Sequence, residues 1–141
     1  MKADRMAADQ VLQDIADYVI DYKVVSEEAL NTSRNCLMDT IGCGLLALKY
    51  PNCTRHLGPI VPGTTVENGA RVFGRSFELD PVKAAWDIGT IVRWLDFNDT
   101  WLAEEWGHPS DNLGAIIALS DYISRVNIAN HKSPLSIKDV L

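Results

Sequence analysis

The chain has 141 residues, of which 47% are hydrophobic and 23% are charged, and its formal net charge is −6. This length and composition are those of one ordinary globular domain and exclude a disordered chain. Lysine and arginine are scattered singly along the sequence, so no basic stripe is available for a phosphate backbone, and no nucleic-acid partner is expected.

The sequence also shows no sign of a membrane or of export. No apolar run approaches the roughly 18 residues that a membrane-spanning helix needs. The opening residues MKADRMAADQ have neither the apolar core of a signal peptide nor the acid-poor pattern of a transit peptide. Three cysteines (Cys36, Cys43 and Cys53) without a C-x-x-C pair favour free thiols. We therefore expect a cytoplasmic protein with no membrane partner.

Two amphipathic helices are predicted near the start of the chain. From Ala7 to Tyr22 apolar residues recur at helical spacing, and three aspartates form the opposite, solvated face. Ser26 is a natural N-cap for a second helix, because two glutamates follow it in the first turn. Two glycines in the GCG run at 42–44 would weaken that helix, so a neighbouring helix is expected to approach closely there. The predicted buried stripe of the second helix is Leu30, Cys36, Leu37, Ile41, Leu45 and Leu48.

Proline and glycine break the segment from Lys49 to Leu79, which predicts an irregular stretch. Thr64–Val66 and Ala70–Phe73 are β-prone and could at best form a small hairpin. A stretch of about thirty residues with little helix is long for a compact domain, so it is expected to be functional or to pack on something outside the domain. His56 within it is interpreted as a surface or structural histidine.

A further helix, Val82–Leu95, is predicted to begin at the DP pair at 80–81, with aspartate as N-cap and proline in the first helical position. Its residues are apolar around most of the circumference, which indicates a central helix that is buried on more than one side. Asp87 adds a negative charge to this helix. Because an unpaired buried charge is costly, Asp87 is expected to have a partner or to be exposed.

The PSD run at 109–111 begins another predicted helix, which continues to about Arg125. Gly114 in its first turn permits close packing or the close approach of a ligand. A polar linker, Val126–Ser133, follows. The SIKD run at 136–139 resembles a capping box that opens one more helix, although one turn is too short to be stable alone. We therefore expect the chain to be a piece of a longer protein.

The stretch 93–112, RWLDFNDTWLAEEWGHPSDN, contains most of the groups that could do chemistry. If the preceding helix carried on for a turn, Asp96 and Thr100 would lie one turn apart on the same face. A loop that folds back would bring the lone histidine, His108, to them. An aspartate and a histidine that converge in this way suit general acid–base work, with the threonine hydroxyl as a positioning group. Three tryptophans would form a low-dielectric wall that moves carboxylate and imidazole pKa values toward neutrality: Trp94, Trp101 and Trp106.

Residue types alone leave three interpretations of this stretch open. In the first, Asp96 and Asp99 cap helix ends and His108 is an ordinary loop histidine. In the second, Asp96, Asp99 and His108 bind a metal ion, although one histidine without a cysteine or a second spaced histidine is weak support. In the third, Asp96 and His108 transfer protons without a metal.

The stretch 93–112, together with the DPVKAAWDIG that precedes it, closely resembles the signature region of the MmgE/PrpD family. CLMDTIGCGLLAL, CTRHLGPIVPGT and NGARVFGRSFELDP are similar to other stretches of that family, so the resemblance runs from about Val11 to Arg125. It implies an all-α fold, namely the opening part of the helical domain of a two-domain protein that is usually a homodimer. Residues 1–141 would then be an incomplete N-terminal helical domain, truncated at its C-terminal end.

The resemblance is strongest to the branch of the family that dehydrates 2-methylcitrate to 2-methyl-cis-aconitate in propionate catabolism, through the methylcitrate cycle. It implies hydro-lyase chemistry on a small tricarboxylate, without an iron–sulfur cluster or another cofactor and without a metal. The family's aspartate and histidine fall on Asp96 and His108, which would be the catalytic pair, and its threonine falls on Thr100, which would bind substrate. The family's second histidine and its lysines would lie beyond Leu141. Phe73 and Asp87 stand where proline and asparagine are expected.

Two alternatives remain beside this interpretation. A related branch of the family decarboxylates cis-aconitate, and the residues quoted above do not exclude it or another member. A different class of function is a non-catalytic structural or oligomerisation fragment whose apolar stripes pack on missing partners. In either case the 141-residue chain alone is expected to be inactive.

Overall fold

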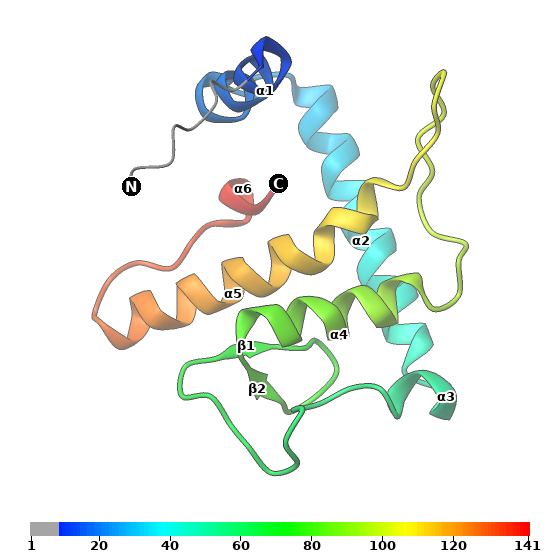
Figure 1. Cartoon of the computed structure of the whole chain (residues 1–141), viewed down its shortest axis with the longest axis vertical. Helices are drawn as coiled ribbons and strands as arrows, with labels where there is room; N and C mark the ends of the chain where they lie inside the picture. Colours follow the sequence, from blue (N-terminus) through cyan, green and yellow to red (C-terminus); the bar gives the residue numbers. More distant parts are fainter. Residues whose placement is uncertain (1–8) are drawn as a thin grey trace, which may run out of the picture.

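The computed structural model describes residues 9–141, which form a mostly helical unit with one very small sheet (Figure 1). The predicted all-α class is confirmed. No helix in the described part of the chain is both long enough and apolar enough to cross a membrane. The elements are α1 (Gln10–Asp21), α2 (Glu27–Ala47), α3 (Pro51–Thr54), β1 (Ala70–Arg71), β2 (Glu78–Leu79), α4 (Pro81–Arg93), the 3₁₀ helix η1 (Pro109–Asn112), α5 (Leu113–Ala129) and α6 (Ile137–Val140).

Three helices begin with the capping chemistry that the sequence predicts. The Ser26 hydroxyl accepts a backbone N–H at the start of α2. The Asp80 carboxylate accepts two backbone N–H groups at the start of α4, where Pro81 takes the first helical position. Ser136 and Asp139 form the expected capping box at the start of α6. These side chains satisfy donors that would otherwise have no partner in the first turn, so they determine where each helix begins.

The core lies where α4 and α5 run side by side and α2 crosses them (Figure 1). At the closest point a Cβ on Gly114 would lie 3.0 Å from the carbonyl oxygen of Ala85 and 3.0 Å from the backbone nitrogen of Gly89. Any larger residue would therefore push the two helices apart, and the expected close packing at Gly114 is confirmed. The largest fully buried apolar side chains of the core are Ile88, Ile91 and Val92 of α4 and Val72 of the segment that follows β1.

The helix α4 is central in its contacts but not buried on more than one side, so that prediction is wrong. It touches α2, α3, α5 and both strands. Val82 and Trp86 on its other side are nevertheless 80% and 60% exposed. The helix also ends at Arg93 and not at Leu95.

Asp87 is completely buried in α4, and it has the partner that the sequence requires. Its carboxylate forms an ion pair with Lys83 one turn earlier and accepts the N–H of Gly58 at 2.7 Å. The Lys83 ammonium also donates to the carbonyl oxygen of His56 at 3.3 Å. This group of hydrogen bonds attaches the irregular segment 49–79 to α4. His56 is exposed and takes part through its backbone carbonyl, in agreement with the surface or structural role predicted for it.

The buried stripe predicted for α2 is partly wrong. Leu45 is 47% exposed, whereas the buried residues of the helix are Thr40, Cys43, Gly44 and Ala47. The reason is that small residues spaced one turn apart let neighbouring groups approach closely. A Cβ on Gly44 would lie 2.6 Å from the ring of Phe73 and 3.3 Å from the side chain of Ile91. The close approach expected at the GCG run thus occurs at its second glycine.

The segment between α2 and α4 contains a hairpin, but with a different partner strand from the one predicted. Ala70 pairs with Leu79 and Arg71 pairs with Glu78 in antiparallel register. Thr64–Val66 forms no strand, and only the Val66 N–H reaches the pair, by donating to the Glu78 carbonyl at 3.0 Å. The rest of the segment is irregular apart from the short α3, as expected.

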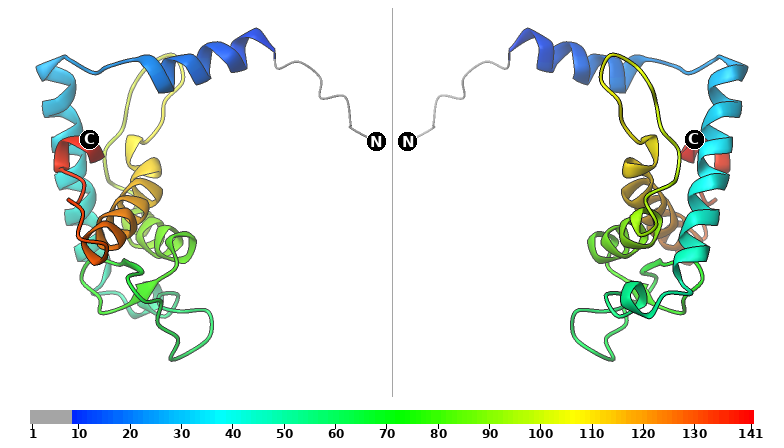
Figure 2. Two further views of the ribbon diagram at one scale, coloured as in Figure 1. Left: turned by 90° about the vertical axis from the view of Figure 1, so that its left-hand side faces the viewer. Right: turned by 90° about the vertical axis from the view of Figure 1, so that its right-hand side faces the viewer.

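The two ends of the described chain differ from the core. The first predicted helix is present as α1, although its expected start at Ala7 lies outside the described residues. Helix α1 has no buried residue, and it extends away from the end of α2 (Figure 2). At the other end α5 continues to Ala129, so the linker predicted from Val126 begins later than expected.

Candidate functional site

The loop between α4 and α5 folds back on itself, and this brings together residues that lie eight apart in the sequence. Trp101 and Gly107 exchange two backbone hydrogen bonds, at 2.7 Å and 3.1 Å, so the intervening residues form a closed projection (Figure 1). Thr100 and His108 flank this pair. The Thr100 hydroxyl consequently lies 3.5 Å from Nδ1 of His108. The expected return of the loop is present, and it joins the hydroxyl to the imidazole.

The orientation of the His108 ring is determined by a backbone group. Its Nδ1 lies 2.6 Å from the carbonyl oxygen of Asp99. Because a carbonyl oxygen only accepts, Nδ1 carries the proton in this contact. In the neutral ring the lone pair then lies on Nε2, which is the atom able to exchange a proton. The ring of Trp106 packs against the imidazole edge-on, with centroids 5.5 Å apart.

Asp99 connects His108 to the rest of the domain through three of its polar atoms. Its carbonyl oxygen meets His108, its Oδ2 accepts the Ser110 N–H at 3.0 Å, and its own N–H donates to Oδ2 of Asp39 at 3.1 Å. The contact with Ser110 caps the start of η1, which is the capping role that the first interpretation assigns to Asp99. Its Oδ1 is buried and has no hydrogen-bond partner in the described part of the chain.

The carboxylate of Asp96 pairs with Arg93, whereas the Thr100 hydroxyl lies beside His108. Helix α4 does not carry on for another turn, because Asp96 has a φ of 54°, in the left-handed region that aspartate tolerates better than most residues. The expected helical spacing of Asp96 and Thr100 is therefore absent. The Asp96 carboxylate is 73% exposed and forms an ion pair with Arg93 at 2.6 Å. The structure thus joins Thr100 to His108 and joins Asp96 to Arg93.

Arg93 organises the base of the loop, and the sequence interpretation did not single it out. Its guanidinium donates to Asn98 Oδ1 at 2.6 Å and pairs with Asp111 at 3.1 Å, in addition to Asp96. Asn98 is buried and donates in turn to the Ser110 hydroxyl. One signal could have identified Arg93, since it is the single cation in the acidic stretch 93–112.

The low-dielectric wall expected from the tryptophans is not formed by this chain, so that prediction is wrong here. Trp94, Trp101 and Trp106 are 37%, 62% and 69% exposed. Trp101 and Trp106 lie on the projecting loop, which leaves both rings mostly exposed in the described structure, and Trp94 lies at the end of α4. An edge contact with His108 is present, but the ring does not enclose the imidazole.

The metal interpretation receives no geometric support. Within residues 9–141 no three histidine, cysteine or acidic side chains are close enough to share an ion. Asp96 lies with Arg93, while the side chain of Asp99 holds η1 and its carbonyl meets His108, so Asp96, Asp99 and His108 do not form one ligand set.

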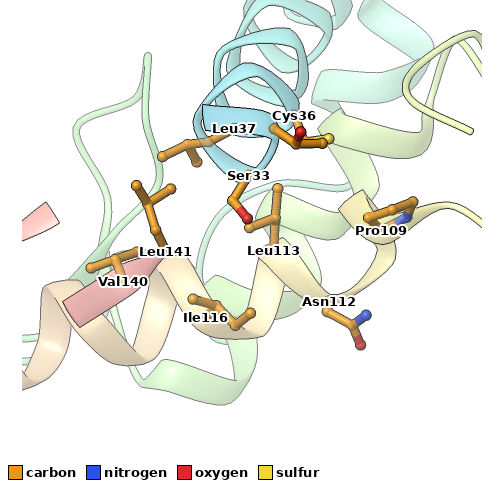
Figure 3. A pocket seen from close by; sticks show the side chains of 10 residues that line it. Ser33, Cys36, Leu37, Pro109, Asn112, Leu113, Ile116, Val140 and Leu141 are labelled. Atoms are coloured by element: carbon orange, nitrogen blue, oxygen red, sulfur yellow. The ribbon is translucent and has the colours of Figure 1, made fainter. Parts of the chain in front are cut away.

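A pocket of about 280 Å³ adjoins the loop on the side of α2 (Figure 3). Leu37, Leu113 and Ile116 supply apolar walls, and Val140 and Leu141 close it from the C-terminal turn. None of Asp96, Thr100 or His108 lines it. The cavity is lined mainly by apolar side chains and lacks all three predicted site residues, so the candidate site is the loop itself.

The surroundings of the three thiols favour their protonated form. Cys36 borders the pocket, and Cys43 and Cys53 are buried; all three are free. Burial raises the pKa of the Cys36 and Cys43 thiols above the usual value, and the carboxylates of Asp39 and Asp99 raise it further. Burial likewise raises the pKa of Cys53. A protonated thiol is a poor nucleophile.

The fold and the loop define a class of protein: a helical domain that presents a histidine, a threonine and carboxylates on one projecting loop. The profile of the MmgE/PrpD N-terminal domain matches residues 13–141. The chain belongs to the MmgE/PrpD family.

Curated relatives with high identity agree with this assignment. The chain is 63% identical to a 2-methylcitrate dehydratase of Cupriavidus necator over 99% of its residues, and 60% identical to one of Salmonella typhimurium over 94%. It is 54% identical to a mitochondrial 2-methylcitrate dehydratase of Yarrowia lipolytica over 97%. These matches cover 29%, 28% and 26% of the respective relatives. The chain therefore spans less than a third of the length of the curated relatives that it matches.

Proposed function

We propose that this chain is the incomplete N-terminal helical domain of a longer hydro-lyase that dehydrates 2-methylcitrate to 2-methyl-cis-aconitate. The observation that carries the proposal is the identity of 63% and 60% to proteins named 2-methylcitrate dehydratase over nearly the whole chain. The length of those relatives supports the view that further residues complete the site. The reaction would belong to propionate catabolism through the methylcitrate cycle.

The loop carries groups that suit this reaction. Dehydration of a β-hydroxy carboxylate needs one group to remove a proton beside a carboxylate and another to protonate the departing hydroxide. In our proposal His108 and Asp96 divide these two roles. Nε2 of His108 is the atom that exchanges the proton, because Nδ1 is engaged by the Asp99 carbonyl. Thr100, whose hydroxyl lies beside the imidazole, binds a substrate oxygen.

The position of Asp96 adds a requirement to this proposal. Its carboxylate is paired with Arg93 at the base of the loop, while the imidazole stands beside Thr100. Since the carboxylate is 73% exposed, a bound substrate can reach it directly. The substrate would then span the distance between the two groups and bring both into one reaction.

The charges of the substrate must be met from elsewhere. Arg93 is the single cation of the stretch 93–112, and it already faces Asp96 and Asp111. We propose that histidine and lysine side chains beyond Leu141 bind the carboxylates. We also propose a homodimer in the cytoplasm that binds no nucleic acid. The acidic net charge of −6 supports the last of these.

The test is a direct assay of dehydration by the longer protein, followed through the ultraviolet absorbance of the new conjugated double bond. The wild-type protein is expected to turn over 2-methylcitrate, and the 141-residue chain alone is expected to be inactive. His108→Ala should lower kcat by about 10²- to 10⁴-fold, the range for loss of a general acid or base. His56→Ala is the matched control, because His56 is exposed and lies outside the loop. A near-normal kcat for His108→Ala would remove His108 from the mechanism.

The same assay separates the two alternatives. A decarboxylase of the same family would release CO₂ from cis-aconitate and leave 2-methylcitrate unchanged. A structural fragment would show neither reaction. The second alternative is favoured by one observation, the exposed apolar face of α1, which buries no residue.

A further inference from the structure

We propose that Asp39 of α2 is a positioning residue for His108, acting through Asp99. The inference rests on the proposed function of His108, and it adds a residue from a helix sixty positions away in the sequence. Asp39 itself touches neither the imidazole nor the hydroxyl of Thr100. Its role is to hold the residue whose backbone carbonyl orients the ring.

The first step of the argument is the attachment of the loop to α2. Oδ2 of Asp39 accepts the backbone N–H of Asp99 at 3.1 Å. The loop projects from the end of α4, and its ends at Trp101 and Gly107 are joined only to each other by their backbone groups. The contact from Asp39 therefore ties the loop to a long helix of the scaffold. A side chain that accepts a backbone N–H restricts the position of the residue to which that N–H belongs.

The second step leads from Asp99 to the imidazole. The same residue that Asp39 holds presents its carbonyl oxygen 2.6 Å from Nδ1 of His108. Its Oδ2 also accepts the Ser110 N–H at 3.0 Å, so Asp99 is held through both its backbone N–H and its side chain. A displacement of Asp99 would move the nearer acceptor of the Nδ1 proton, at 2.6 Å, and leave the Thr100 hydroxyl at 3.5 Å.

The third step is the chemical consequence. A neutral imidazole exists as two tautomers, and the hydrogen bond made by one nitrogen decides which nitrogen carries the lone pair. With Nδ1 donating to Asp99, Nε2 is available for proton exchange. If that acceptor moves, the ring can place its proton on Nε2 or rotate away. Misplacement of a catalytic group by about 1 Å can lower a rate by about 10²-fold.

The experiment compares Asp39→Ala and Asp39→Asn in the longer protein, with Asp17→Ala on exposed α1 as the control. Asp39→Ala is expected to lower kcat for 2-methylcitrate by about 10- to 10²-fold with little change in KM. Asp39→Asn should restore most of the rate, because an amide oxygen still accepts the Asp99 N–H. Nitrogen-15 NMR of labelled histidine supplies a second measurement. The His108 signal, assigned by its loss in His108→Ala, should show the Nδ1–H tautomer in the wild type and a mixture in Asp39→Ala.

The outcomes separate this inference from the proposed function. A wild-type protein that does not dehydrate 2-methylcitrate would overturn the function, while the NMR comparison would still decide whether Asp39 controls the tautomer. If Asp39→Ala keeps both the wild-type kcat and the wild-type tautomer, the positioning role is wrong. It is also wrong if Asp39→Asn is as slow as Asp39→Ala, because a lost hydrogen bond would then not be the cause.

Discussion

The chain contains two regions that are equally helical but very differently packed. In the first, α4 and α5 meet the C-terminal half of α2, and Ile88, Ile91 and Val92 are at most 1% exposed. In the second, α1 extends from the other end of α2 and buries no residue (Figure 2). Its apolar residues Val11, Ile15 and Val19 are 64%, 56% and 73% exposed.

The difference shows that amphipathic spacing predicts a helix but not the surface that covers it. Helix α1 has regular apolar spacing, whereas the buried face of α2 is made of small residues and a threonine. Small residues produce a close contact because backbones can meet, as they do at Gly114. The burial of apolar side chains in the packed region therefore stabilises the folded chain. The exposed apolar face of α1 contributes little to the free energy of folding within residues 9–141.

The largest difference in stability between the two regions is expected when one lysine in each region is replaced by methionine. Lys83→Met should destabilise the chain by about 3–5 kcal/mol, the usual cost of leaving one partner of a buried ion pair without the other. The fully buried carboxylate of Asp87 would keep only the Gly58 N–H. The measurement is urea unfolding followed by helical circular dichroism.

Lys23→Met is the matched variant, because Lys23 lies in the exposed connection between α1 and α2. It should change the free energy of unfolding by at most about 0.5 kcal/mol. Equal losses in the two variants would mean that the packed region does not carry the stability of the chain, and the comparison would fail.

Replacing one isoleucine by alanine in each region compares how much side-chain packing stabilises that region. Ile88→Ala should cost about 2–5 kcal/mol, since it removes a fully buried side chain and leaves a cavity in the core. Ile15→Ala removes the same atoms from a side chain that is 56% exposed. Its cost should stay below about 1 kcal/mol in this chain. Both values come from the same urea titration, and a loss at Ile15 as large as that at Ile88 would show that α1 packs on a surface.

Local sequence signals predicted the local structure well. Ser26 and Asp80 identified the starts of α2 and α4, and Ser136 identified α6, because capping depends on residues within one turn. Asp87 was expected to need a partner, and Lys83 one turn away supplies it. These outcomes depend on neighbours in the sequence, which a single sequence contains.

Contacts between distant residues were less accessible from the sequence. Asp39 and Asp99 are sixty positions apart, and no spacing rule joins them. The end of α4 at Arg93 depends on the left-handed conformation of Asp96, which rotates that side chain toward Arg93. The resemblance to a family pointed to Asp96, Thr100 and His108 together. Of the residues that hold the loop, Arg93 had one sequence signal, as the single cation of the stretch 93–112, whereas the role of Ser110 became visible only with the fold.

The smallest predicted difference in stability is expected when one aspartate in each region is replaced by asparagine, and it depends on pH. Asp121 of α5 pairs with Arg71 of β1 at 2.6 Å. Burial alone would raise the pKa of Asp121, but hydrogen bonds from the side chain and backbone of Arg71, and the charges of Arg71 and Arg125, outweigh it and hold the pKa below the usual value. The folded chain therefore keeps this carboxylate charged in more acidic solution than the unfolded chain does.

The sign of the pH effect follows from this lowered pKa. The stabilisation is complete above the unfolded-state pKa and is lost as the pH falls through the folded-state pKa. Asp121→Asn should thus lower the free energy of unfolding at neutral pH and match the wild type in strongly acidic solution. The loss should not exceed about 1 kcal/mol, because the Arg71 side chain is 58% exposed and water screens the pair. Asp17→Asn on α1 should follow the wild type at both pH values in the same urea titrations. If Asp121→Asn remains less stable than the wild type in acid, the loss comes from altered packing of the side chain and not from its charge. The ion pair would then not distinguish the packed region from α1.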